Sequence, residues 1–565
     1  MTENTVGAFI VEILTTAMYE DSKDAYREYI QNACDSIDKA ERLGILASRS
    51  IDAKYPDLGQ GVVDIWLKPD ERYICIEDNG TGIKAGEFQS TLRKFADSDK
   101  IMGQDKGFRG IGRLIGLAYC KRAVFTSRWK GEDIVSIMEC DAQKMQHMIN
   151  EAYTKVKRHT FNDLMNAISQ FGTRNADDSD RGHFFRVELF DVNEENEQLF
   201  GGADSDSFEQ LTDHLSFVAP VPYHANFLYR KEIYDYAKSR HNQIDEYNIR
   251  INGEQIFKKY KTILRTGNGE DEVYGVQFHD FVANDDTLLG WMWFGKTSFK
   301  ASIKEEELSR GLRLRKENIQ IGHAGTLRDM FTREASRRGN GYFIGEVFAI
   351  SRNLIPNSKR TYFNENPTRI DFELQMKDYF NNTLYHIYYE GSNINSNIKK
   401  IVSFNEKAAE FGKKLQESDF LTPEELKREE RELKKAEQLA EKAKKDLDKK
   451  RTNNRSILTN EILTHRIKRI PPIVGSTISS TQDVRDGDSA AYINDTSNKH
   501  TKQSFLVDKI FPQANEDERK LLFETLDKIL VVIRKLANEK TSEDIVSMIR
   551  EELKSIISKV RKEFK

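Results

Sequence analysis

The first 205 residues combine helical and strand-like patterns of hydrophobic positions. Residues 9–40 repeat apolar side chains at helical spacing, in one stripe near Phe9 and a second around Ile30. Short apolar runs between turn residues predict strands at Val62–Leu67, Tyr73–Glu77, Val124–Ser127, Ile134–Glu139 and Phe184–Phe190, with helices near Glu87–Phe95, Ile111–Cys120 and Asp141–Tyr153. Helices interleaved with strands predict an α/β layer domain over residues 1–205.

A second mixed unit is predicted over residues 206–375. Its strand-like stretches are Tyr247–Ile251, Val273–Phe278, Leu288–Phe294 and Phe343–Ala349, and a helix signal surrounds Thr326–Ser336. The fold class expected for the chain is therefore α+β, with an α/β sandwich followed by a second α/β domain and then by helices.

Residues 376–453 predict a helical connector and a coiled coil. Thr422 and Pro423 form a helix start, with Glu425 three residues after the threonine cap. Apolar side chains then recur every seven residues at Leu426, Leu433, Ala440 and Leu447. Because this seam is short and rich in alanine, two alternatives stay open: a pairing helix or helical hairpin, and a lone solvated helix.

The last part of the chain changes in composition. Residues 454–503 are polar and without periodicity, which predicts a disordered linker. Residues 504–565 predict a C-terminal helical module of two amphipathic helices. So small a module buries little apolar surface alone, and we expect it to dock or dimerise.

Composition narrows the class of protein. The chain has 565 residues, 38% of them hydrophobic and 32% charged, with a formal net charge of −4, which argues against nucleic acid coating the whole surface. No stretch approaches the roughly 20 apolar residues of a membrane span, and the N-terminus lacks a basic leader. We expect a cytoplasmic protein without a membrane partner, whose cysteines are reduced and buried: Cys34, Cys75, Cys120 and Cys140.

Candidate chemistry begins on the second half of the first predicted helix. Glu28, Asn32 and Asp35 follow one another at i, i+4 and i+7, which places them on one stripe of the helix. A carboxylate can activate water, an amide oxygen can reach Mg²⁺, and a second carboxylate can orient its neighbours. On this segment alone, a solvated helix face is the favoured interpretation, because short polar spacings recur by chance.

Two further segments strengthen the functional interpretation. The predicted strand before Asp78 ends in an acidic residue and a glycine turn, with Gly80, Gly82 and then Ile83 as an apolar wall; such a carboxylate can accept the amine of adenine. A glycine-rich loop then leads into an apolar helix, and its bare amides suit a triphosphate: Gly107, Phe108, Arg109, Gly110, Ile111 and Gly112. The polar stretch 97–106 is the predicted lid over the nucleotide.

The order E-x-x-x-N-x-x-D, D-x-G-x-G and G-x-x-G-x-G resembles the nucleotide site of the GHKL superfamily (gyrase, heat-shock chaperone, histidine kinase, MutL), whose ATPase unit is the Bergerat fold. The resemblance implies a slow, Mg²⁺-dependent ATPase. It assigns Glu28 as general base, Asn32 as Mg²⁺ ligand, Asp35 to the ribose and adenine side, Asp78 as adenine reader and Gly107, Gly110 and Gly112 to the phosphates. The family's last motif, Gly-Thr before a strand, is here Gly182-His183, so either His183 or Thr173 takes over that role.

The second unit is similar to the transducer domain that follows the ATPase in several branches of this superfamily. Transducers offer a basic residue to the γ-phosphate. The candidates lie in 311–318, with Lys316 first and Arg315 next, and surface charge explains them nearly as well.

One competing motif is rejected. Residues 290–297 match the P-loop pattern G-x-x-x-x-G-K-T, but Trp291, Met292, Trp293 and Phe294 are bulky residues that favour a strand. ATP binding should therefore not depend on Lys296.

Two functions remain open. The chain resembles prokaryotic chaperone-like or MORC-like ATPases, which implies an ATP-dependent homodimer. One hypothesis is a clamp that closes non-specifically on DNA, supported by the basic residues of 309–360: Arg313, Arg315, Arg333, Arg337, Arg338 and Arg360. The other is a chaperone-like or signalling ATPase with a protein client or partner, and a role in phage defence would be analogy alone.

Overall fold

The computed structural model describes residues 6–13, 15, 21–49, 58–94, 106, 112–201, 208–417, 419–452 and 473. The described residues all belong to one compact unit within residues 1–475. The predicted linker over 454–503, apart from Ile473, and the predicted module over 504–565 lie outside the described residues, as do most of the predicted lid and residues 107–111 of the glycine-rich loop.

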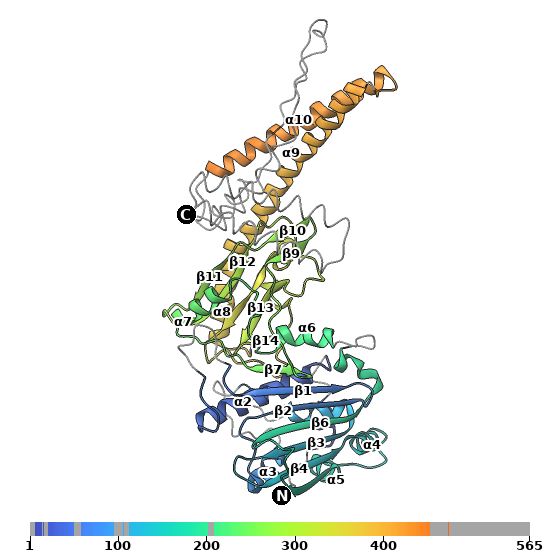
Figure 1. The fold of residues 1–565 in the computed structure, drawn as a ribbon, viewed down its shortest axis with the longest axis vertical. Coiled ribbons are helices and arrows are strands. Elements are labelled where there is room, and N and C mark those ends of the chain that lie inside the picture. Colours follow the sequence, from blue (N-terminus) through green and yellow to red (C-terminus); the bar gives the residue numbers. More distant parts are fainter. Residues whose placement is uncertain are drawn as a thin grey trace, which may run out of the picture. The chain divides into compact units, whose positions relative to one another are not determined.

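The first sheet has eight strands in the order β5-β4-β3-β6-β2-β1-β7-β8 (Figure 1). All neighbours are antiparallel except β1 and β7, which run parallel. The strands are β1 (Val62–Lys68), β2 (Tyr73–Asp78), β3 (Cys120–Arg128), β4 (Ile134–Asp141), β5 (Ser169–Asn175), β6 (Phe184–Val192), β7 (Asn248–Ile251) and β8 (Glu254–Gln255).

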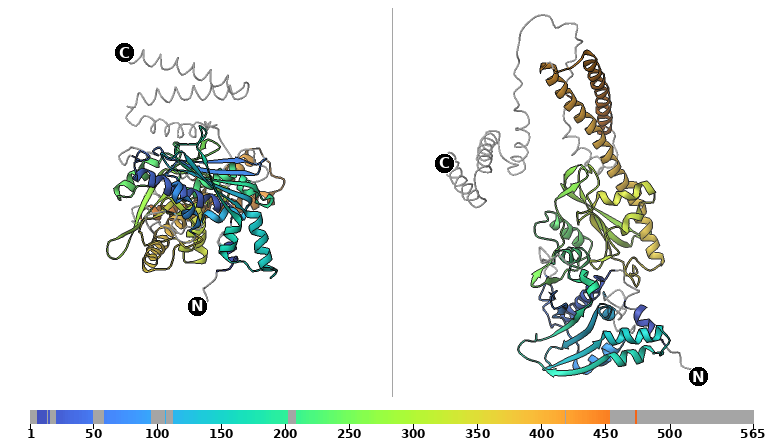
Figure 2. Two further views of the ribbon diagram at one scale, coloured as in Figure 1. Left: turned by 90° about the horizontal axis from the view of Figure 1, so that it is seen from below. Right: turned by 90° about the vertical axis from the view of Figure 1, so that its right-hand side faces the viewer.

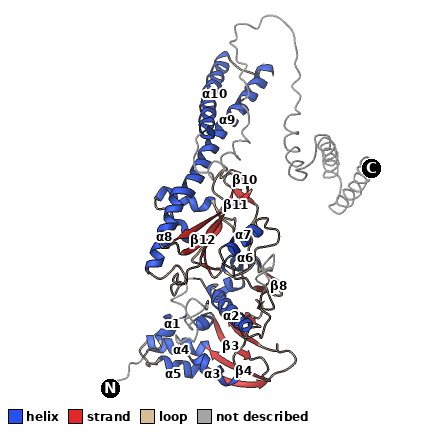
Figure 3. Ribbon diagram, turned by 90° about the vertical axis from the view of Figure 1, so that its left-hand side faces the viewer, coloured by secondary structure: helices blue, strands red, loops and turns tan. Residues whose placement is uncertain are grey.

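Helices cover one face of this sheet, as the view of β3 and β4 from the side shows (Figure 3). Apolar residues of the strands, such as Val63 and Ile65 of β1, are buried against them. The helices are α1 (Phe9–Glu12), α2 (Asp24–Arg42), α3 (Ala85–Arg93), the 3-10 helix η2 (Gly112–Ala118), α4 (Ala142–Tyr153) and α5 (Phe161–Ile168). The layered fold predicted for the first domain is confirmed.

Three predictions need correction. The helical stretch expected over residues 9–40 is not continuous, because Asp21–Lys23 form a turn before α2 in which the Asp21 side chain accepts the Lys23 N–H. The helix expected after the glycine-rich loop is the shorter η2. The strand expected in the second unit at Tyr247–Ile251 is β7 of the first sheet, which β8 extends, so the boundary near residue 205 does not separate the strands of the two sheets.

The second sheet has five strands in the order β11-β12-β15-β13-β14, with only β13 and β15 parallel. They are β11 (Gly275–Val282), β12 (Leu288–Lys296), β13 (Gly311–Lys316), β14 (Ile319–Ile321) and β15 (Ile344–Ala349), beside the small pair β9 (Ile263–Thr266) and β10 (Gly269–Glu272). Trp291, Met292, Trp293 and Phe294 are fully buried inside β12. The rejection of the P-loop motif is thus confirmed, because these residues form a strand rather than a phosphate loop.

Helices lie on both faces of the second sheet. Met292 and Phe294 pack towards α8 (Pro367–Tyr379) and the start of α9 (Tyr385–Glu417), whereas Trp291 and Trp293 pack towards α7 (Arg230–Ser239). The remaining short helices are η3 (Glu194–Phe200), α6 (Glu209–Val218), η4 (Thr326–Met330), η5 (Glu334–Tyr342) and the single π-helical turn η6 (Phe380–Leu384). The helix signal around 326–336 therefore corresponds to two 3-10 helices.

Helix α10 (Pro423–Thr452) folds back along α9, and the two helices lie side by side in the right-hand view of Figure 2. Leu433, Ala440 and Leu447 are buried against Ile401 and Phe404 of α9. The Glu425 N–H donates to the Thr422 hydroxyl at 3.1 Å, which confirms the predicted helix start. Of the two alternatives for the heptad seam, the structure has the intramolecular hairpin.

All four cysteines are buried and unpaired, as expected, and burial raises the pKa of Cys120 to about 12. Among the residues that the structure describes, no helix is long and apolar enough to cross a membrane.

Candidate functional site

Helix α2 carries the three polar residues of the predicted stripe. Asp35 is buried, and Glu28 and Asn32 are half-buried. On the other side of the helix, Tyr26, Tyr29 and Ile30 anchor it in the core of the first domain. The stripe is therefore not an ordinary solvated helix face.

Gly112 brings the start of η2 against Glu28. A Cβ atom added at Gly112 would lie 2.4 Å from the Glu28 Oε2 atom, so only glycine permits this approach. The Tyr29 hydroxyl fixes the same contact, because it donates to the Arg113 carbonyl at 3.1 Å and accepts the Gly116 N–H at 3.0 Å. The end of the glycine-rich loop thus lies directly beside the predicted base.

Asp78 ends β2 in a buried position, and its Oδ1 accepts the Gly80 N–H at 2.9 Å. The following turn contacts α2, because the Thr81 N–H donates to the Ser36 Oγ at 3.1 Å. A Cβ at Gly80 would lie 2.2 Å from the same Oγ. Ser36 is one helical turn beyond Asn32, so the stripe and the strand end meet at this serine.

Gly82 and Ile83 are held from the opposite side. Gly82 has φ +65°, and a Cβ there would lie 2.1 Å from the Arg128 carbonyl oxygen. The Ile83 N–H donates at 2.8 Å to the buried Ser127 hydroxyl, which itself donates to the Phe184 carbonyl at 3.1 Å. Sequence reasoning missed Ser36 and Ser127, since a single serine carries no pattern.

His183 reaches the site, and Thr173 does not. The His183 Nδ1 donates to the Gly80 carbonyl at 2.7 Å. Thr173 is exposed on β5, the edge strand, and β4, β3 and β6 separate it from β2. Of the two residues proposed for the last motif, the structure brings only His183 to the turn after Asp78.

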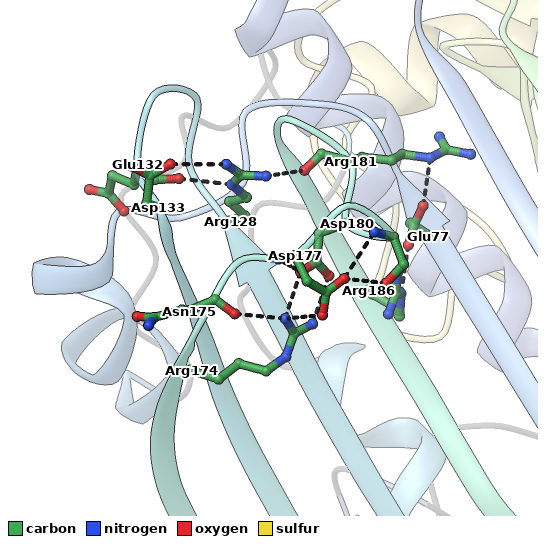
Figure 4. Close-up of polar contacts among 11 residues, drawn as sticks. Glu77, Arg128, Glu132, Asp133, Arg174, Asn175, Asp177, Asp180, Arg181 and Arg186 are labelled. Carbon is green, nitrogen blue, oxygen red and sulfur yellow. Dashed lines mark hydrogen bonds and ion pairs between the residues drawn. The ribbon is translucent and has the colours of Figure 1, made fainter.

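Ion pairs hold the loop that carries His183 (Figure 4). Arg174 binds both carboxylate oxygens of Asp180 at 2.6 Å. Arg181 contacts Glu77, the neighbour of Asp78, at 2.7 Å, and Arg128 donates to the Arg181 carbonyl at 3.2 Å. Bidentate arginine–carboxylate pairs fix geometry well, so the loop is tied to the strands beside the site.

Lys106, the last residue of the predicted lid, joins α2 through two contacts. Its backbone N–H donates to Asp35 Oδ1 at 2.7 Å, and its ammonium binds Asp38 at 2.8 Å. Its side chain is about 5% exposed. Burial alone would lower the pKa of Lys106, but the carboxylates of Asp245 and Asp38 raise it well above its usual range.

Arg360, from the loop after β15, reaches the predicted base. Its Nε lies 3.5 Å from Glu28 Oε1, and its Nη2 donates to the Lys106 carbonyl at 2.6 Å. Lys316 instead donates to the Ser351 carbonyl at 2.8 Å, and burial lowers its pKa. Arg315 is fully buried in an ion pair with Glu346. The two residues expected to serve the nucleotide thus bind Ser351 and Glu346, whereas Arg360 contacts Glu28.

The basic stretch 309–360 is less exposed than the clamp hypothesis requires. Arg313, Arg315 and Arg360 are at most 8% exposed, so they cannot line a surface for a phosphate backbone. Arg337 is paired with Asp329 and Glu334. Arg333 and Arg338 stay exposed.

Residues 19–173 match the family model of the histidine kinase-, DNA gyrase B- and HSP90-like ATPases. This range runs from the segment before α2 to β5, and it includes Glu28, Asn32, Asp35, Asp78 and Gly112. A search of curated proteins found no match. The N-terminal part of the chain is therefore similar to a GHKL-type ATPase domain.

Proposed function

We propose that the chain binds ATP with Mg²⁺ at the site on α2 and hydrolyses it slowly. The observation that supports this best is the convergence of three segments. The stripe of α2 meets the turn after Asp78 at Ser36, and it meets the end of the glycine-rich loop at Gly112. The family match of residues 19–173 supports the same chemistry.

Each part of the pocket receives one role. Asp78 accepts the adenine amine, and Gly80, Gly82 and Ile83 face the flat ring. The His183 ring and Asp35 support this side through the Gly80 carbonyl and the Lys106 N–H. The loop 107–112 offers its amides to the phosphates.

The residues present fit Mg²⁺. Asn32 and Glu28 place oxygen donors one turn apart on α2, and Gly112 lacks the Cβ that would crowd Glu28. Asn32 would hold the ion, which when bound offsets the charge of the triphosphate. Among the described residues no group of three His, Cys, Asp or Glu side chains could hold a metal by itself, so the nucleotide would supply the other ligands.

Hydrolysis needs a base and a cation near the γ-phosphate. We assign the base to Glu28. Its carboxylate accepts a proton from water while the water oxygen attacks the γ-phosphorus and the bond from that phosphorus to ADP breaks. We assign the cation to Arg360 rather than Lys316, because Arg360 comes from the second α/β unit and contacts Glu28. Its guanidinium can pass from Glu28 to phosphate, which would link the second unit to the nucleotide.

The base assignment is tested by Glu28→Gln. The variant should bind ATP as the wild type does but lose hydrolysis by at least about 100-fold, because the amide cannot accept the proton. Glu87→Gln is the matched control, since Glu87 is an exposed acid on α3. Retained turnover in Glu28→Gln would contradict the role of Glu28.

We also propose that ATP draws two copies into a homodimer. The burial of Arg313, Arg315 and Arg360 weakens the case for a DNA clamp, and the α9–α10 hairpin offers a surface for a protein client. Mass measured by light scattering with and without a non-hydrolysable ATP analogue tests the dimer. Salt-sensitive binding of duplex DNA by that dimer would favour nucleic acid, and its absence would favour a protein client.

A further inference from the structure

The loop before β7 connects α2 to the second sheet. Asp245 lies 3.5 Å from the Lys106 ammonium through its carboxylate, and the Tyr247 hydroxyl donates to Asp38 at 2.7 Å. The Glu246 carbonyl accepts from Arg49 at 3.0 Å. Consecutive residues of one loop therefore contact residues at the C-terminal end of α2, Lys106 and the segment after the helix.

Asn318 of the second sheet holds this loop. Its amide nitrogen donates to the Asp245 carbonyl at 2.6 Å, and its amide oxygen accepts from the Lys258 ammonium at 2.7 Å. Asn318 is 1% exposed. It occupies the turn between β13 and β14, where Glu317 and Asn318 have φ of 52° and 58°, and asparagine tolerates this left-handed conformation.

Behind Asn318 stands a fully buried cluster of charges. Lys258 binds Glu346 at 3.0 Å, Arg315 is paired with the other oxygen of Glu346, and Arg315 also donates to the Asn318 carbonyl at 2.9 Å. All three charged side chains are 0% exposed. Buried charges tolerate little displacement because every lost partner leaves a costly unpaired group. The cluster therefore forms a rigid mount for Asn318.

The other end of the same network is at the proposed base. Asp245 contacts Lys106, and the carbonyl of Lys106 accepts from Arg360, which contacts Glu28. A shift of the Asp245 loop would thus move Lys106 and Arg360 together. The path from Lys258 to Glu28 consists of hydrogen bonds and ion pairs between side chains and main-chain atoms.

We propose that Asn318 is a positioning residue for ATP hydrolysis: through Asp245, Lys106 and Arg360 it holds Glu28 where this base can activate water, although Asn318 touches no nucleotide. This inference rests on the proposed function. A displaced base slows the chemical step without removing the contacts that bind adenine. Loss of the Asn318 side chain should therefore lower kcat and leave the KM for ATP nearly unchanged.

The test is Asn318→Gly in the full-length chain, since glycine keeps the left-handed turn and removes the side chain that carries the amide. We expect kcat to fall about ten-fold while KM changes less than about two-fold. The matched control is Asp286→Gly, another left-handed residue in an exposed hairpin turn of the same sheet, which should leave both constants unchanged. Unchanged kcat in folded Asn318→Gly would overturn the proposal.

Asn318→Asp separates positioning from stability. Aspartate can still accept from Lys258 but has no N–H for the Asp245 carbonyl, so kcat should fall as in the glycine variant although the buried cluster keeps its partner. If Asn318→Asp restores both the melting temperature and kcat that Asn318→Gly loses, Asn318 has a structural role alone.

A readout without turnover distinguishes this inference from the proposed function. In the nucleotide-free protein, hydrogen exchange at the Lys106 amide should be about ten-fold faster in both Asn318 variants, because its bond to Asp35 is no longer supported. If the wild type has no ATPase activity, the proposed function is wrong. If hydrogen exchange at the Lys106 amide is unchanged in the variants, the coupling from Asn318 to Lys106 is wrong.

Discussion

Arg360 is a polar-loop residue that becomes almost fully buried beside Glu28. Its contact makes it the candidate for the basic group near the γ-phosphate. Arg360→Gln should lower kcat about 100-fold, the usual effect of removing one donor that stabilises developing charge. Lys316→Gln should change kcat by less than about three-fold, because Lys316 binds backbone carbonyls instead. If Lys316→Gln lowers kcat strongly and Arg360→Gln does not, Lys316 is the basic group near the γ-phosphate, as the sequence predicted.

Gly112 offers a second test at single-residue scale. In Gly112→Ala the new methyl group would meet Glu28 Oε2 at 2.4 Å, so the carboxylate must move. We expect kcat to fall at least about ten-fold with a smaller change in ATP affinity. Gly86→Ala is the control, because no atom lies within 4 Å of its added Cβ and alanine favours helix α3. Steady-state kinetics of both variants measure these effects. Full activity of Gly112→Ala would contradict the assignment of Glu28 as the base.

Residues inside one motif could be predicted from the sequence, and residues that act alone could not. Glu28, Asn32 and Asp35 share one helix spacing, and Asp78 precedes a glycine turn. Arg360 donates to the Lys106 carbonyl across 254 residues of the chain, and no local pattern predicts such a contact. The last motif was incomplete in the sequence, so His183 and Thr173 were both candidates for its role. Only the order of the strands in the sheet distinguishes them.

At the scale of elements, the α9–α10 hairpin depends on its apolar seam. Leu433 is 4% exposed within the seam, whereas Leu439, on the same helix, is 54% exposed. Leu433→Ala should lower the free energy of unfolding of the hairpin by about 2–3 kcal/mol, and Leu439→Ala by less than about 0.5 kcal/mol. Urea unfolding followed by the helical circular dichroism signal measures both. Equal losses would mean that the seam does not hold the helices together.

A pH effect is expected where β11 meets α8. His279 stacks on Tyr379 at 3.6 Å, and burial lowers the pKa of His279 to about 4 from 6.5. The unfolded chain therefore binds the proton more readily, so stability is full above pH 6.5 and falls as the pH drops towards 4. We expect a loss of about 1–2 kcal/mol, reduced from the full shift because the ring is partly exposed.

The variant His279→Phe keeps the aromatic stack and cannot bind a proton. The free energy of unfolding of this variant should lack the wild-type decrease over that pH window, as measured by denaturant titration at several pH values. The exposed His386, changed to Phe, serves as control. An identical acid sensitivity in His279→Phe and wild type would assign the effect to other groups.

Elements with strong periodicity were predictable, and their partners in the sheet were not. The strands β1, β2, β4 and β6 begin at the predicted residues, because each alternates against one core. β5 was missed, since its residues are mostly exposed at the sheet edge. The parallel pairing of β7 with β1 depends on where the chain returns after 185 residues, as in the bond from Leu67 to Asn252, and short strands carry no such information.

At the scale of the whole molecule, the second sheet and the ATPase domain share a set of buried polar contacts rather than a simple linker. The β7–β8 segment belongs to the first sheet, while the residues just before it contact Asn318 of the second. The pattern of hydrophobic positions correctly indicated the α+β class, but the basic stretch that suggested DNA binding is partly buried in this network. Charge counted along a sequence does not reveal which charges are exposed.

The central claim is that one pocket binds ATP, and calorimetry of the full-length protein with ATP and Mg²⁺ tests it most directly. The account predicts saturable binding in the wild type and in Asp70→Asn, an exposed aspartate in the turn before β2, and at least about 100-fold weaker binding in folded Asp78→Asn. No heat of binding in the wild type, or unchanged affinity in Asp78→Asn, would contradict it.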